Sequence, residues 1–171
     1  MSMATATLVT VEEYLAHTYE PDCDFVAGVL EERNVGQKDH SKVQLRIAAW
    51  FLNRSQSLGL ASFVEIRIRV SANRYRIPDV TVTHLPEPEE QVFTAAPYIC
   101  IEILSPDDSF SKVQTRVHDY VLMGVENIWI LDPQQKAAWI CKGDSMHAVT
   151  GDSVSSLDGI VAVPLSDVFE D

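Results

Sequence analysis

The chain has 171 residues, 46% of them hydrophobic, which suits one globular domain (residues 1–171) with a sizeable core. No apolar run approaches the roughly 20 residues that span a bilayer, and no signal peptide is recognisable, so we expect a cytoplasmic protein without a membrane partner. The formal net charge of −12 excludes a uniformly basic surface for nucleic acid, although arginines concentrate between residues 67 and 76.

The N-terminal part of the chain is expected to form a short helix, a hairpin and a long helix. Residues 10–13 have the S/T-x-x-E form of a capping box, which starts a helix. Residues 24–31 suit two short strands around a tight turn. From about residue 39 to 58, apolar side chains recur every three or four positions, and Gly59 is a natural C-terminal stop. His40, near the start of this helix, is a minor candidate for a site.

The middle of the chain is rich in strand patterns. Apolar and polar residues alternate over residues 64–70, which predicts a single strand with one solvated face. A second strand is expected at about residues 75–83, where Pro78 cannot donate to a ladder and indicates an edge or a distortion. Residues 98–104 are almost wholly apolar, as in a strand that is covered on both faces.

The C-terminal part is expected to contain a crossover unit. A helix over about residues 109–123 is ended by Gly124, and an apolar strand follows at residues 126–131. A strand, a helix and a strand in this order predict parallel pairing of the two strands. Shorter strands follow around residues 137–141 and His147. The fold class is therefore expected to be α/β, with a mixed central β-sheet flanked by helices on both faces.

Two carboxylates in these strands indicate a metal site. Glu102 interrupts the apolar run, where an unpaired charge would be costly, so it needs a partner. Asp79 follows Pro78 on the preceding strand, and pairing of the two strands would bring both side chains into one cleft. Mg²⁺ prefers hard oxygen ligands and keeps several waters, so two carboxylates and a backbone carbonyl such as that of Ile103 would suffice.

A cation near this cleft would stabilise a phosphoryl transition state or help to deprotonate a water nucleophile. Leu104, two residues after Glu102, cannot serve. Lys112 and Arg116 are four residues apart and therefore share one face of the expected helix. The simpler interpretations are a structural ion pair of Glu102 with one of these cations and a strand-end role for Asp79.

Several motifs occur in an order that is typical of a known family. Three of them lie around the expected cleft: Pro78-Asp79, residues 101–106 with Glu102 among them, and Tyr120-x-x-x-Gly124-Val125. Three further segments extend the likeness over most of the chain: residues 10–15, 24–28 and 127–133. Together these motifs resemble the Uma-type restriction endonuclease family of the PD-(D/E)XK nuclease superfamily.

The resemblance implies a restriction-endonuclease-like core and a Mg²⁺-dependent (or Mn²⁺-dependent) site that cleaves phosphodiester bonds in DNA. Carried over by position, Asp79 and Glu102 are the metal ligands, and Asp24 stands where many members have a Glu before the hairpin turn. The superfamily's Lys two places after the Glu is absent, and this branch supplies it from the helix, at the position of Arg116. Arginine is a poor general base because it is always charged, so Lys112 is the candidate substitute.

Three functions remain open at this point. The first is a Mg²⁺-dependent endonuclease acting on DNA as a homodimer, because cutting two strands favours two sites. The second is a nuclease-derived binding or regulatory protein, which the altered Lys position and the acidic net charge favour. The third, a thiol hydrolase using Cys100 or Cys141, is disfavoured because neither cysteine lies in an electropositive turn or at a helix start. We expect the cysteines to be reduced packing residues.

Overall fold

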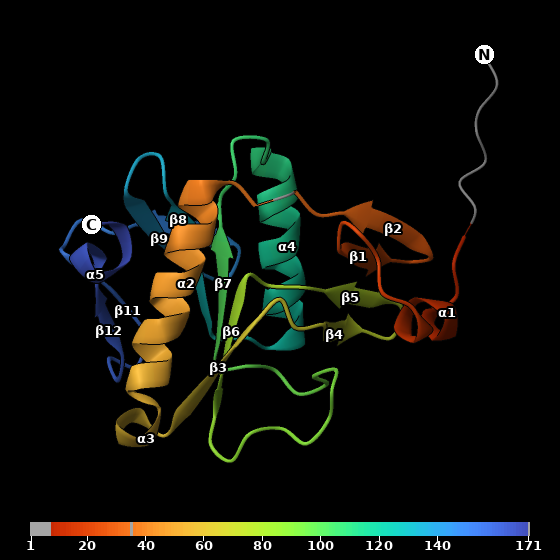
Figure 1. Ribbon diagram of the computed structural model, residues 1–171, viewed down its shortest axis with the longest axis horizontal. Coiled ribbons are helices and arrows are strands. Elements are labelled where there is room, and N and C mark those ends of the chain that lie inside the picture. The colour runs from red at the N-terminus through yellow and green to blue at the C-terminus, as the bar shows by residue number, and fades with distance from the viewer. Residues whose placement is uncertain (1–7, 35, 171) are drawn as a thin grey trace.

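The computed structural model describes residues 8–34 and 36–170, and strands from this part of the chain form three sheets (Figure 1). The largest is a mixed six-stranded sheet with, in spatial order, β10 (Ser145–Ala148), β9 (Ala137–Lys142), β8 (Asn127–Asp132), β7 (Ile99–Ile103), β6 (Val80–His84) and β3 (Leu60–Val64). An antiparallel four-stranded sheet has the order β2 (Val29–Glu32), β1 (Cys23–Val26), β5 (Arg74–Arg76) and β4 (Ile68–Ser71). The short strands β11 (Ser153–Ser155) and β12 (Ala162–Pro164) pair with each other.

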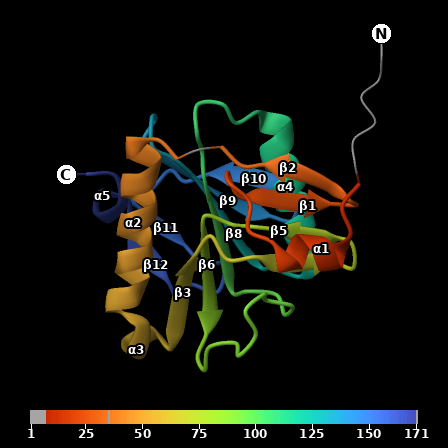
Figure 2. The same cartoon turned by 45° about the vertical axis from the view of Figure 1, so that its right-hand side comes forward.

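Helices cover both faces of the six-stranded sheet, as the sequence predicts (Figures 1 and 2). α2 (Lys38–Asn53) and the short α5 (Leu165–Phe169) pack on one face, and α4 (Phe110–Met123) packs on the other. β7 supplies both layers, because successive strand residues point to opposite faces. Ile101 packs in the α2 layer and Cys100 in the α4 layer, so Glu102 belongs to the α4 face. Among the described residues, no helix is both long and apolar enough to cross a membrane.

The predicted crossover unit is confirmed. β7 and β8 are parallel neighbours, paired from Ile99 opposite Asn127 to Ile103 opposite Leu131, and α4 connects them. The Ser109 side chain caps the start of α4 by accepting a hydrogen bond from the backbone N–H of its third residue. Gly124 ends the helix in the left-handed conformation, with φ at 97°.

The N-terminal elements also form as predicted. α1 (Val11–Ala16) begins at Thr10, whose hydroxyl accepts a hydrogen bond of 3.1 Å from the backbone N–H of Glu13. β1 and β2 form the expected hairpin, and both residues of its turn, Ala27 and Gly28, have positive φ. This hairpin joins the four-stranded sheet through β5 (Figure 2).

The long helix is shorter than expected. α2 ends at Asn53, and a separate turn of helix, α3 (Ser55–Leu58), continues to the predicted stop at Gly59, which has φ of 65°. The interruption is at Arg54, whose φ and ψ of −114° and 7° lie outside the helical region. Asn and Ser on either side of Arg54 are weak helix formers, because their side chains compete for backbone hydrogen bonds.

The prediction of a single strand over residues 64–70 is wrong. β3 ends at Val64, Glu65 takes a left-handed conformation with φ of 52°, and β4 then begins in the other sheet at Ile68. The expected strand over residues 75–83 is likewise divided into β5 and β6, and Pro78 lies in the interruption. Alternating polarity reports which residues are buried, but it does not tell one strand from two strands that continue in different sheets.

The two interruptions face each other and create a junction between the sheets. β3 pairs with β6 up to Val64 opposite Val80, while β4 pairs with β5 from Ile68 opposite Arg76. The same antiparallel ribbon therefore leaves the six-stranded sheet and enters the four-stranded one. Asp79 lies at this point of divergence, directly before β6.

Candidate active site

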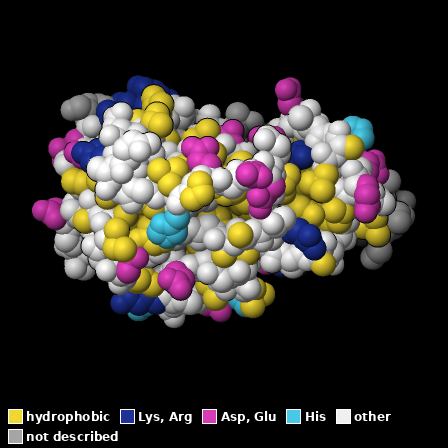
Figure 3. Space-filling model, turned by 90° about the horizontal axis from the view of Figure 1, so that it is seen from below, with side chains coloured by type: hydrophobic (Ala, Val, Ile, Leu, Met, Phe, Trp, Pro, Cys, Tyr) yellow, Lys and Arg dark blue, Asp and Glu magenta, His cyan; other side chains and the backbone are white. Residues whose placement is uncertain are grey.

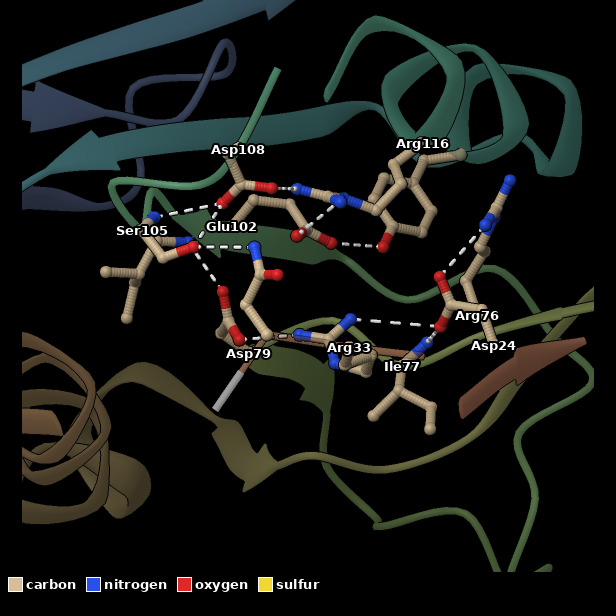
Figure 4. Close-up of polar contacts among 12 residues, drawn as sticks. Asp24, Arg33, Arg76, Ile77, Asp79, Glu102, Ser105, Asp108 and Arg116 are labelled. Atoms are coloured by element: carbon tan, nitrogen blue, oxygen red, sulfur yellow. Dashed lines mark hydrogen bonds and ion pairs between the residues drawn. The ribbon is translucent and has the colours of Figure 1, made fainter. Parts of the chain in front are cut away.

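A cavity of about 600 Å³ opens at the junction of the two sheets (Figure 4). Its walls come from the hairpin, from the start of α2, from the end of β7 and from α4. All of the residues that the sequence nominates line it: Asp24, His40, Asp79, Glu102, Lys112 and Arg116. The tertiary structure thus brings together side chains that are up to 92 positions apart, from residue 24 to residue 116.

Asp79 is 3% exposed and anchored on both oxygens. Its Oδ2 accepts a hydrogen bond of 2.6 Å from the backbone N–H of Ile103. Its Oδ1 accepts one of 2.6 Å from Arg33 Nη2 and lies 3.4 Å from His40 Nε2. Burial acts to raise the pKa of Asp79, but the His40 hydrogen bond and the Arg33 charge outweigh it and lower the pKa below its ordinary value.

Glu102 is 1% exposed, and its pKa is shifted in the opposite direction to that of Asp79. Burial raises its pKa, and although the Arg116 charge lowers it, the nearby Asp79 carboxylate raises it further. Tyr120 donates a hydrogen bond to Oε1, and Arg116 Nε lies 3.0 Å from Oε2. The structural ion pair that the simpler interpretation predicts is therefore present, and the two carboxylates also repel each other.

Arg116 links Glu102 to the loop after β7. Its Nη2 donates to Asp108 Oδ1 over 3.1 Å, and Asp108 in turn accepts hydrogen bonds from the backbone and side chain of Ser105. The Nε contact with Glu102 is close but not aligned for a hydrogen bond, so that nitrogen has no acceptor among the described residues. Lys112, one turn earlier on α4, is exposed at the cavity and makes no ion pair within the described part of the chain.

Asp24 lines the cavity, but its oxygens hold the hairpin in place. Oδ1 accepts a hydrogen bond of 3.0 Å from the backbone N–H of Ile77, and Oδ2 accepts one of 2.9 Å from Arg76 Nη1. Arg76 is itself buried and also contacts Glu31 and Asp119. Asp24 therefore ties β1 to the junction at which Asp79 lies.

Arg33 is a site residue that sequence reasoning missed. It follows β2 and places its guanidinium between Asp79 and Asp24 (Figure 4). Burial opposes its charge, but Asp79, Glu102 and Asp24 together raise its pKa above the ordinary value. A single arginine after two glutamates has no distinctive spacing, so the sequence offered no signal for it.

Most of the chain matches a family and a solved structure that are described as putative nucleases. A family model described as "Uma2: Putative restriction endonuclease" matches residues 11–165. The chain belongs to this family. A crystal structure of a putative nuclease belonging to DUF820 from Anabaena variabilis is similar with a TM-score of 0.81 and 22% identity, over 94% of this chain and 97% of that one. Comparison with the curated proteins finds no match.

A second solved structure, a DrdV–DNA complex, gives a TM-score of 0.46 and 15% identity over 67% of this chain and 10% of that chain, and this likeness carries no inference. The Anabaena structure shares the fold, so the α/β, restriction-endonuclease-like core that the sequence predicts is confirmed. Membership of the Uma2 family places the chain among the nucleases at a coarse level.

The Uma2 site fits a divalent metal in its chemistry. Asp79, Glu102 and the Ile103 carbonyl are hard oxygen donors beside one cavity, and Mg²⁺ needs only one or two carboxylates because it keeps several waters. Within residues 8–34 and 36–170, no group of three or more Asp, Glu, His or Cys side chains is arranged to hold a metal. The guanidinium groups of Arg33 and Arg116 balance the charge of the two acids.

The concentration of arginines at residues 67–76 left a basic face possible in this Uma2 chain, but these arginines do not form one. Arg74 and Arg76 both pair with Asp119, and Arg67 donates to the backbone carbonyls of Tyr14 and His17. Figure 3 shows that neither acidic nor basic side chains gather into a continuous patch on the face it presents.

Proposed function

We propose that this Uma2-family chain is a Mg²⁺-dependent or Mn²⁺-dependent endonuclease that hydrolyses phosphodiester bonds in DNA. One observation carries the proposal: Asp79 and Glu102 are buried beside one cavity, close enough that the Asp79 carboxylate raises the pKa of Glu102. Two buried carboxylates that repel each other are costly, and the structural alternatives for such a pair are protonation, arginine partners or a divalent cation. Nuclease chemistry uses the last of these.

The residues of the cavity divide into three roles. Asp79, Glu102 and the Ile103 carbonyl would hold the metal, which supplies, when bound, positive charge at the scissile phosphate and an activated water. Lys112 is exposed and unpaired within the described part of the chain, so it suits contact with the phosphate backbone. Arg116 keeps Glu102 in place and adds positive charge, but it is always protonated and does not act as a base.

Two further expectations accompany this proposal. A homodimer would bring two sites to one duplex, which favours a double-strand cut. A reducing compartment such as the cytoplasm agrees with the three cysteines, which are all free and buried. Sedimentation of the purified protein, alone and with a DNA duplex, would measure the oligomeric state.

A second candidate is a nuclease-derived protein that binds without cleaving. It is favoured by the pairing of Asp79 with Arg33, of Glu102 with Arg116 and of Asp24 with Arg76. Such pairs neutralise the acids without any metal. If this second candidate is correct, divalent metal neither binds the protein nor stabilises it.

The decisive experiment is a plasmid-nicking assay on the full chain with Mg²⁺, Mn²⁺ or EDTA, combined with thermal unfolding under the same conditions. We expect nicking and a higher unfolding temperature with metal, and loss of both in Asp79→Asn and Glu102→Gln. Glu89→Gln is the matched control, because Glu89 is exposed and lies outside the cavity. Absence of nicking and of any metal-dependent stabilisation in the wild-type chain would refute the endonuclease and support the second candidate.

A further inference from the structure

Arg33 holds an unusual position for a residue outside every strand and helix. Its backbone N–H donates to the Asp22 carbonyl over 2.8 Å, which fixes the chain where β2 ends. From there the side chain reaches into the cavity and is only 15% exposed. Nη2 lies 2.6 Å from Asp79 Oδ1, and Nη1 lies 3.8 Å from Asp24 Oδ1 (Figure 4).

The three acids around Arg33 differ in their other partners. Asp24 also pairs with Arg76, and Glu102 also pairs with Arg116. Asp79 has only His40 besides Arg33 as a cationic or titratable partner in the described part of the chain. Asp79 Oδ2 is already bound to the backbone N–H of Ile103. Arg33 is therefore the principal positive charge beside the other oxygen, Oδ1.

We propose that Arg33 is a resident counter-ion that competes with divalent metal for Asp79 Oδ1 and thereby sets the metal affinity of the site. The inference rests on the proposed function, since it takes Asp79 as a metal ligand. A guanidinium at hydrogen-bond distance and a metal ion compete for this oxygen, because two cations in a buried site repel each other and each lowers the negative charge that the other can use. Metal binding therefore weakens or displaces the contact between Arg33 and Asp79.

Arg33 compensates the charge of Asp79, as Arg116 compensates that of Glu102, so neither acid is an unpaired buried charge. The competition lowers the metal affinity of the site, because a bound ion must oppose or displace the Arg33 charge.

Calorimetric titration of the full chain with MnCl₂ alone tests this directly, with wild type, Arg33→Gln, Arg33→Lys and Arg69→Gln compared. We expect Arg33→Gln to bind Mn²⁺ at least about tenfold more tightly than wild type, because a competing charge is removed while the oxygens stay. Arg33→Lys retains a cation and is expected to remain within about threefold of wild type. Arg69→Gln removes an equal charge at an exposed position outside the cavity and is expected to match wild type.

Thermal unfolding supplies a second readout. Without metal, Arg33→Gln is expected to unfold at a lower temperature than wild type, and added Mn²⁺ is expected to raise its unfolding temperature by more than that of wild type. Should Arg33→Gln fail to fold, Arg33→Met replaces it in the titration, because it removes the charge and keeps an unbranched side chain. Arg33→Met is then expected to bind Mn²⁺ at least about tenfold more tightly than wild type, and equal affinities would contradict the competition.

The outcomes separate this inference from the function on which it rests. If Arg33→Gln binds Mn²⁺ no more tightly than wild type, while Asp79→Asn abolishes binding, Arg33 is not a competitor and the metal site stands. If neither wild type nor Arg33→Gln binds Mn²⁺, the proposed function fails and the inference fails with it.

Discussion

The backbone N–H of Ile103 donates a hydrogen bond of 2.6 Å to Asp79 Oδ2. This bond joins the residue before β6 to the last residue of β7, directly after Glu102. Asp79 belongs to no strand, yet its carboxylate cannot rotate without leaving a buried donor unpaired. The relative placement of the two acids therefore depends on the pairing of β6 with β7, in which Val80 lies opposite Ile101.

Asp79→Asn is expected to destabilise the protein by about 3 kcal/mol at pH 7, because it removes the nearest carboxylate from the buried guanidinium of Arg33. The pKa of Asp79 is lowered in the folded state, so its contribution is present above the unfolded value of 3.8 and is lost as pH falls through the folded value. Denaturant unfolding at a series of pH values should show the difference between wild type and Asp79→Asn shrinking below pH 3.8. A difference that stays constant down to pH 2 would contradict the ion pair.

Lys112→Ala is expected to slow plasmid nicking about tenfold while changing the free energy of unfolding by less than about 0.5 kcal/mol. The side chain is exposed at the cavity, so its removal costs charge near the phosphate but no packing. Lys142→Ala is the matched control, because Lys142 is exposed at the end of β9 and lies outside the cavity. Unchanged nicking in Lys112→Ala would remove Lys112 from the site.

Arg116→Lys restores the lysine that the family resemblance implies at this position of the helix. A lysine keeps the positive charge next to Glu102 but can lose its proton, so we expect nicking at least as fast as in wild type. We also expect a stability loss of about 1 kcal/mol, because the hydrogen bond to Asp108 is lost. Nicking rates and denaturant unfolding of Arg116→Lys and Arg116→Gln measure both effects, and equal rates in the two variants would show that no cation is needed here.

The cysteines are expected to be unreactive toward a thiol reagent such as DTNB in the native protein and to react fully after unfolding in guanidinium chloride. All three are buried, and burial raises the pKa of Cys141 to about 12 and that of Cys100 well above its ordinary value. Burial, followed by the nearby acids, also raises the pKa of Cys23. Rapid native labelling that inhibited nicking would revive the thiol hydrolase.

Local sequence was sufficient for the elements whose signals are local. The Ser109 cap, the Gly124 stop and the apolar period between them determine α4, and the strands on either side make the crossover. The candidate site followed from motifs as well, because Asp79 directly precedes β6, the strand next to Glu102 in β7, and a buried acid in an apolar run demands a partner.

Only the tertiary structure decided how those acids are balanced. The alternation over residues 64–70 does not reveal that Glu65 turns the chain from one sheet into the other, because that choice depends on which distant strands are free to pair. Arg33 likewise reaches Asp79 only because the hairpin docks against this junction, 46 positions away along the chain. Hydrophobic period and capping are properties of neighbouring residues, whereas the pairing of buried charges is a property of the packed chain. This is why the sequence named both carboxylates and Arg116 but not Arg33, the counter-ion of Asp79.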